Sequence, residues 1–161
     1  MLPPLDAHHI TAHFCSGEPT LDRWLKERAL SSRANHTART FVRCDGLNVV
    51  GFYAISMGAF DPAEATGKFR RNTPEIIPVA LLARLAVDRT RQRQRYGCAL
   101  FRDSVQRVLQ ASEFIGTHGM VVHAISEEAK AFYLALGFAA SPIKGMTLMI
   151  SLADLRRGFG A

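Results

Sequence analysis

A short basic segment near the middle of the chain combines residue types that can bind an anion. Its arginines occupy alternate positions: Arg89, Arg91, Arg93 and Arg95. The segment follows an apolar run ending at Val87 and precedes a stretch of helical spacing that begins near Gly97. Unpaired N–H groups and the helix dipole favour an anion at a helix start. A strand, a basic loop and a helix therefore predict a phosphate-binding site, and the alternative is a solvated basic loop that aids solubility.

The charge of the whole chain favours the same kind of partner. Lysines and arginines total 20 against 14 acidic residues, and the sequence pI is about 9.7. Such an excess favours polyanions, either nucleic acid or phosphorylated cofactors.

Metal chemistry has little support in the sequence. Three cysteines, Cys15, Cys44 and Cys98, are widely spaced and form no CxxC pair, so we expect neither disulfides nor zinc but buried thiols. His9 and His13 have no acidic or cysteine ligand at useful spacing. We therefore expect no metal site.

The first half of the chain supplies a helix and a hairpin. Leu21, Trp24, Leu25 and Ala29 recur at helical spacing, which predicts a helix over about 19–33 with Thr20 as its cap. Residues 40–44 and 49–60 are rich in β-branched and aromatic types and flank a turn-forming segment, which predicts an antiparallel hairpin. Residues 61–77 are polar and indicate a short helix and a loop.

The second half must position the basic segment. The nearly unbroken apolar run over 78–87 predicts a central strand covered on both faces. A helix from Gly97 to about Phe114, a strand over 120–124 and a helix capped by Ser126 and ending at Gly137 follow. Phe138 and residues 146–152 complete a mixed α/β sheet. We expect a single domain over 1–161, no membrane span, no export signal and a cytoplasmic location.

At the basic segment the chain resembles the GCN5-related N-acetyltransferases (GNAT). Residues 92–97 (QRQRYG) occupy the slot of that family's acetyl-CoA loop, Q/R-x-x-G-x-G/A, while 82–88 (LARLAVD) and 131–138 (AFYLALGF) resemble its cofactor strand and helix end. The resemblance implies an α/β, GNAT-like, mixed and mostly antiparallel sheet flanked by helices. It also implies that the backbone of Leu85, Ala86 and Val87 pairs with the pantetheine arm of acetyl-CoA. The resemblance further implies that the loop and the first helical turn bind the pyrophosphate. These residues are Gln92, Arg93, Gln94, Arg95, Tyr96, Gly97 and Cys98.

The N-terminal half narrows the resemblance. Residues 14–25, 37–42 and 50–54 look like the acetyltransferase toxins of bacterial type II toxin–antitoxin pairs. Membership would imply acetylation of the α-amino group of aminoacyl-tRNA, a block of translation, a ribbon-helix-helix antitoxin as partner and a homodimer. The candidates for contacts with tRNA phosphates are basic residues: Arg39, Lys68, Arg70, Arg71, Arg89 and Arg91.

Tyr133 is the candidate catalytic residue. A phenol with a pKa of ~10 is protonated at neutral pH and can donate its proton to a departing thiolate, as its family counterpart does. The helical pattern alone, with Phe132 and Leu136 beside it, favours a core aromatic.

Two loop positions depart from the family pattern. Arg95 replaces the glycine at the fourth motif position, and Arg93 stands where these toxins commonly carry another glycine. A guanidinium could replace lost backbone donors to phosphate, or it could fill the loop and exclude the cofactor. The second case describes a binding or regulatory module without catalysis. A third possibility keeps the enzyme and changes the acceptor to a small amine or a protein N-terminus.

Overall fold

The computed structural model describes residues 1–160, which form two compact units. The first contains residues 1–56 and 82–104, and the second contains residues 57–81 and 105–160. The six strands follow the hydrogen-bonded order β1-β2-β3-β4-β6-β5. Pairs β1–β2, β4–β6 and β5–β6 are antiparallel and β3–β4 is parallel, which confirms the mixed, mostly antiparallel sheet. The expectation of a single domain stays a prediction.

The first unit opens with two short helices rather than one. These are α1 (Pro19–Glu27) and α2 (Ala29–Ala34), and the predicted continuous helix over 19–33 is wrong. Arg28 leaves the helical conformation with φ of −120°, and beyond Ala29 the segment has no further buried position to extend the apolar stripe. Glu18, not Thr20, is the N-cap residue, because Pro19 already occupies the first helical turn.

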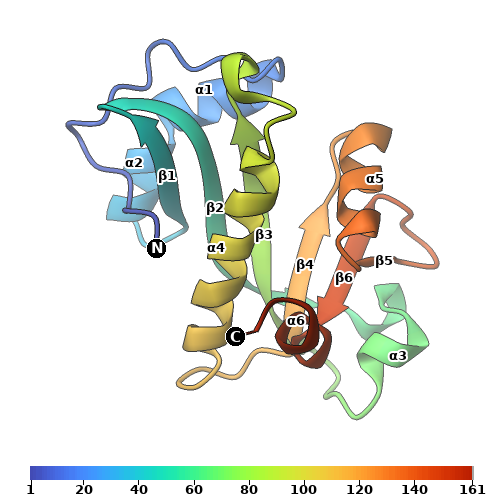
Figure 1. The fold of residues 1–161 in the computed structure, drawn as a ribbon. Coiled ribbons are helices and arrows are strands. Elements are labelled where there is room, and N and C mark those ends of the chain that lie inside the picture. Colours follow the sequence, from blue (N-terminus) through green and yellow to red (C-terminus); the bar gives the residue numbers. More distant parts are fainter. Residues whose placement is uncertain (161) are drawn as a thin grey trace. The chain divides into compact units, whose positions relative to one another are not determined.

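The predicted hairpin is confirmed as β1 (Arg39–Asp45) and the first part of β2 (Asn48–Phe60). Helices α1 and α2 lie on one face of it and the start of α4 (Tyr96–Ala111) on the other (Figure 1). Leu21, Leu25 and Phe52 share the core on the first face. On the opposite face the Tyr53 hydroxyl donates a hydrogen bond to the Asp103 carboxylate of α4.

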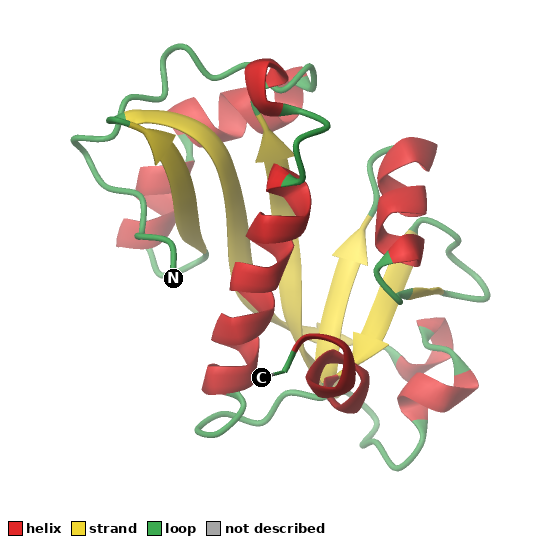
Figure 2. Ribbon diagram, viewed as in Figure 1, coloured by secondary structure: helices red, strands yellow, loops and turns green. Residues whose placement is uncertain are grey.

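The second unit contains the start of β3 (Ile77–Val87) and strands β4 (Gly119–His123), β5 (Ala139–Ala140) and β6 (Thr147–Ser151). Its helices are 3-10 helix η1 (Pro62–Glu64), α3 (Gly67–Arg70), α5 (Glu127–Ala135) and α6 (Leu152–Phe159), and Figure 2 separates helices from strands. The predicted central strand and the Ser126 cap are confirmed. Helix α6 was not expected. The predicted strand over 146–152 ends at Ser151, whose side chain caps α6 by accepting from the Asp154 N–H.

Candidate active site

Asp88 fixes the point where β3 ends and the basic loop begins. Its buried carboxylate accepts hydrogen bonds from the N–H of Cys15 at 2.8 Å and from the N–H and hydroxyl of Thr90 at 3.0 and 2.6 Å. Asp88 thereby caps the 3-10 helix η2 (Arg89–Arg91). Burial opposes ionisation, but the hydrogen bonds from Thr90 and Cys15 and the charge of Arg91 outweigh it, so the pKa of Asp88 lies below its usual value.

Arg93 and Arg95 both adopt the left-handed backbone conformation, with φ of 60° and 65°. Glycine reaches this region without cost, whereas other L-residues pay about 1–2 kcal/mol. The two arginines therefore replace the family's glycines in a loop that keeps a glycine-like path. Successive N–H groups in a turn with left-handed residues can form an anion-binding concavity, so these φ values favour the predicted pyrophosphate site, which stays a prediction. Both side chains are exposed, and neither forms an ion pair or hydrogen bond within residues 1–160.

The first turn of α4 continues the loop. The guanidinium carbon of Arg43 lies 4.2 Å from the centre of the Tyr96 ring, a cation–π contact that fixes the helix start. Cys98 is exposed, and so is Cys15, while Cys44 is partly buried. The expectation of buried thiols is therefore wrong for Cys15 and Cys98. The buried positions of α4 are instead Leu100, Phe101, Ser104, Val105 and Val108.

The end of β3 is the segment predicted to meet the pantetheine arm. Ala86 is buried in the core of the first unit, and Leu85 and Val87 are partly buried. The residue pairs between β3 and β4 involve Ala80 and Leu81, so residues 82–87 extend beyond them along the strand. The Ala86 side chain thus has a packing role, and the contact of this backbone with the pantetheine arm stays a prediction.

Tyr133 lies in α5 of the second unit and is only 6% exposed. Its ring makes edge contacts with Phe132 and Phe138, with centroids 5.1 and 5.4 Å away. Burial raises the pKa of Tyr133, so its hydroxyl remains a proton donor well above neutral pH. The residue is thus both a packed aromatic, as its helical pattern predicts, and a protonated phenol.

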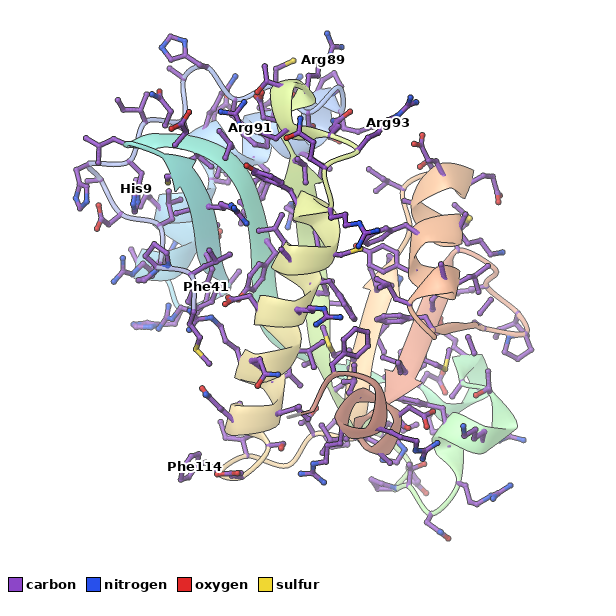
Figure 3. All side chains as sticks on the ribbon, viewed as in Figure 1. His9, Phe41, Arg89, Arg91, Arg93 and Phe114 are labelled. Atoms are coloured by element: carbon purple, nitrogen blue, oxygen red, sulfur yellow. The ribbon has the colours of Figure 1, made fainter. Side chains whose placement is uncertain are left out.

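In the first unit the candidate tRNA-binding residues have local contacts. Arg91 pairs with Asp45 at 2.9 Å, and Arg39 donates to the carbonyl of Arg33 at 3.0 Å. Arg89 is exposed and its guanidinium lies beside Gly17. Arg89, Arg91 and Arg93 gather at one end of the unit (Figure 3).

In the second unit the remaining candidates lie on α3 and just after it. Lys68 forms an ion pair with Asp154 at 3.0 Å, whereas Arg70 and Arg71 are exposed at the end of the helix. Lys68 and Arg89 are exposed as well, but within residues 1–160 neither Arg70 nor Arg71 forms an ion pair.

Sequence reasoning missed the segment at Cys15 and Ser16. Cys15 meets Asp88 across 73 positions of sequence, and no local pattern reports such a contact. The importance of Asp88 was predictable, because a carboxylate directly after a buried strand is unusual and needs hydrogen-bond partners.

Within residues 1–160 no group of three or more histidine, cysteine or acidic side chains could hold a metal ion. Over the same residues no helix has both the length and the apolar character needed to cross a membrane.

The sheet order, the central strand that runs into a left-handed loop and the helix that follows together define a GNAT-fold protein. No protein-family model matches the chain. A tRNA-acetylating toxin of Mycobacterium tuberculosis is 44% identical over 155 residues, covering 96% of this chain and 93% of that protein. A probable toxin TacT of Sinorhizobium fredii is 27% identical over 99% of this chain and 95% of its own length. The chain belongs to the family of tRNA-acetylating toxins.

Solved structures extend the similarity to complexes. The toxin AtaT with acetyl-methionyl-tRNA matches with a TM-score of 0.88 at 26% identity, covering 98% of this chain and 97% of that one. A tyrosine-to-phenylalanine variant of AtaT, bound to the C-terminus of the antitoxin AtaR and to acetyl-CoA, matches with a TM-score of 0.85 at 26% identity. The match covers 100% of this chain and 98% of that one. A tyrosine-to-phenylalanine variant of KacT matches with a TM-score of 0.86 at 27% identity, covering 93% of this chain and 92% of that one.

Proposed function

We propose that the protein is a toxin that transfers the acetyl group of acetyl-CoA to the α-amino group of aminoacyl-tRNA and so blocks translation. The observation that carries this proposal is the left-handed backbone of Arg93 and Arg95. It supports an enzyme over a degenerate binding module, because a loop that keeps a glycine-like path can present its N–H groups to a pyrophosphate. The 44% identity to a tRNA-acetylating toxin supports the same choice.

In this proposal the backbone does most of the cofactor binding. The N–H groups of residues 92–97 and of the first turn of α4, which includes Cys98, receive the pyrophosphate. The main chain of Leu85, Ala86 and Val87 pairs with the pantetheine arm as an added strand. The exposed guanidinium groups of Arg93 and Arg95 add charge at the mouth of the loop.

Tyr133 is the proposed proton donor. The α-amine of an aminoacyl ester has a pKa near or below ~7.7, so a useful fraction is neutral without a strong base. This amine attacks the thioester carbonyl, the C–N bond forms and the C–S bond breaks. The phenol donates its proton to the departing thiolate, the proton lost by the amine passes to water, and the phenolate regains a proton from water before the next turnover. The raised pKa of Tyr133 keeps the donor protonated until this step.

The partners follow from the relatives. AtaT is solved with acetyl-methionyl-tRNA and with the antitoxin AtaR, which supports a charged tRNA and an antitoxin as partners here. We further propose that the antitoxin is of the ribbon-helix-helix type, that the toxin is a homodimer and that it acts in the cytoplasm, where charged tRNA is found. Arg39, Lys68, Arg70, Arg71, Arg89 and Arg91 are the proposed contacts with tRNA phosphates.

Calorimetry with acetyl-CoA and a comparison of acceptors test this function. We expect binding of acetyl-CoA and acetylation of charged tRNA. Absence of binding would leave a non-catalytic module. If the protein binds acetyl-CoA but acetylates only small amines or protein N-termini, the acceptor is one of these and not aminoacyl-tRNA.

A further inference from the structure

Gln92, the first residue of the loop motif, uses its side chain within the protein. The Nε2 group of Gln92 donates hydrogen bonds to the carbonyl of Ser16 at 2.7 Å and to the carbonyl of Val87 at 2.9 Å. An amide nitrogen carries two hydrogens, so both donors are used. The side chain therefore joins three backbone segments of the first unit: the end of β3, the start of the loop and the segment before α1.

The segment before α1 is itself held in place, so Gln92 is tied to a fixed point. The Ser16 hydroxyl donates to Asp22 of α1 at 2.6 Å, and the Ser16 N–H donates to the same carboxylate at 3.0 Å. One residue earlier, Cys15 donates to Asp88 at 2.8 Å and accepts from the Arg89 N–H at 2.8 Å. Helix α1 thus anchors the segment, and the segment anchors both ends of η2.

We infer that Gln92 is a positioning residue, which sets the place of the pyrophosphate-binding backbone by clamping the loop to Ser16 and Val87. The inference rests on the proposed function, since it concerns how the same loop holds acetyl-CoA. It also accounts for the alternative that the family motif allows at this position. Glutamine and arginine differ in charge, but each can donate two hydrogen bonds to neighbouring carbonyls. Their shared chemistry is donation to the main chain rather than attraction of phosphate.

The two hydrogen bonds of the Gln92 side chain matter because the loop that follows has a strained backbone. Arg93 and Arg95 follow Gln92 directly in a conformation that arginine avoids. Without the two hydrogen bonds, the loop can adopt conformations of lower energy in which its N–H groups no longer point to one place. Acetyl-CoA would then bind only the fraction of molecules whose loop has the competent conformation. Its apparent Kd would equal the intrinsic Kd divided by that fraction.

The test compares three variants of Gln92 with a control outside the loop. Gln92→Met keeps the length of the side chain and removes the donors, Gln92→Glu replaces donors by acceptors, and Gln92→Arg keeps donors. The control is Gln110→Met, because Gln110 is an exposed glutamine of α4 outside the proposed cofactor-binding residues. The full chain is titrated with acetyl-CoA and with S-acetylpantetheine, which lacks the pyrophosphate, below the unfolding temperature of each variant.

Loss of two hydrogen bonds should weaken acetyl-CoA binding about tenfold or more in Gln92→Met and at least as much in Gln92→Glu. We expect S-acetylpantetheine binding and kcat at saturating acetyl-CoA to stay within about twofold, because the clamp acts on the pyrophosphate loop. Gln92→Arg and Gln110→Met should bind like the wild type. Asp22→Asn, which loosens Ser16, should shift acetyl-CoA affinity in the same direction as Gln92→Met.

Unchanged acetyl-CoA affinity in Gln92→Met would overturn the inference, as would equal losses for both thioesters, which indicate a general effect on the fold. Weak binding by Gln92→Arg would also overturn it. A wild-type chain that binds neither thioester would instead contradict the proposed function.

Discussion

Arg95 repeats, at φ of 65°, the left-handed conformation that Arg93 adopts at φ of 60° two residues earlier in the same loop. The other non-glycine residues with positive φ in the described chain are His36 and Asn72, types that visit this region more readily. The pair of arginines therefore preserves a backbone path for which glycine is the natural residue. This conformation favours a working cofactor loop over one blocked by its own side chains, and variants of Arg95 test the choice.

Replacing Arg95 by glycine should stabilise the protein. Removing Cβ at a positive φ relieves about 1 kcal/mol of strain, so the free energy of unfolding should rise by about that amount in denaturant titrations. Arg95→Ala is the matched control, because it removes the guanidinium and keeps the strain. Equal stability of the alanine and glycine variants would contradict the assigned conformation.

The same position should tolerate loss of its side chain and reject a negative charge. We expect Arg95→Gly to bind acetyl-CoA with similar or modestly better affinity, since the backbone donors remain. Arg95→Glu should abolish binding, because it places like charge beside the pyrophosphate. A gain of binding in Arg95→Gly from a wild type that has none would show instead that Arg95 blocks the loop.

Much of this site was predictable from sequence, and the remainder depends on long-range contacts. The apolar run over 78–87 and the Ser126 cap predicted a central strand and a helix start, because periodicity and capping are local properties. The QRQRYG segment, together with the resemblance, located the loop. The contact between Cys15 and Asp88 spans 73 positions, and the left-handed φ of Arg93 and Arg95 contradicts their intrinsic preference. Neither could be read from neighbouring residues.

Two errors in the helices have local causes. Arg28 breaks the first helix although no glycine or proline marks the site, because helix continuation there depends on what the next turn can bury. The strand predicted over 146–152 overlaps only the first residue of α6, and no helix was predicted beyond it, although Ser151 and Asp154 have the spacing of a helix N-terminus. Attention to that capping pattern would have found it.

Substituting Tyr133 by phenylalanine should leave the fold intact and remove most acetyl transfer. The ring keeps its contacts with Phe132 and Phe138, so we expect the melting temperature to change little. Loss of a positioned proton donor should lower kcat by about 10²–10⁴-fold. Equal turnover of the variant and the wild type would remove Tyr133 from the mechanism.

The stability of the protein at high pH should also depend on Tyr133. Because burial raises its folded-state pKa above the unfolded value of ~10, its neutral form stabilises the fold below pH ~10, and this contribution is lost as the pH rises further. Denaturant titrations between pH 8 and 11 should therefore show a steeper loss of stability for the wild type than for Tyr133→Phe. Parallel profiles would contradict the buried state of the phenol.

Asp88 should stabilise the loop mainly through its ionised form. Since its pKa is lowered in the folded state, its contribution is present above the unfolded pKa of ~3.9 and is lost as the pH falls through the folded value. We expect Asp88→Asn to reduce the free energy of unfolding by about 1–3 kcal/mol at pH 7, because an amide NH2 would face the Thr90 donors. The difference from wild type should shrink below about pH 4. A deficit independent of pH would contradict the ionised state.

Binding of tRNA should weaken steeply with salt. Arg70→Gln and Arg71→Gln should each lower affinity for all tRNAs alike and reduce the salt slope by about 1, because each removes one phosphate contact. Lys26→Gln, an exposed basic residue of α1 outside the candidate set, is the control. Salt-independent affinity, or an equal effect of the control, would exclude these arginines from the interface.

The most direct test of the account is transfer of a labelled acetyl group. The purified chain is incubated with acetyl-CoA labelled in the acetyl group and with charged or uncharged tRNA, and the nucleotide-linked product is identified by mass spectrometry. We predict N-acetyl-aminoacyl-tRNA from charged tRNA only, and about 10²-fold or more slower formation with Tyr133→Phe. Binding of acetyl-CoA and of charged tRNA without any transfer of label would contradict the proposed function.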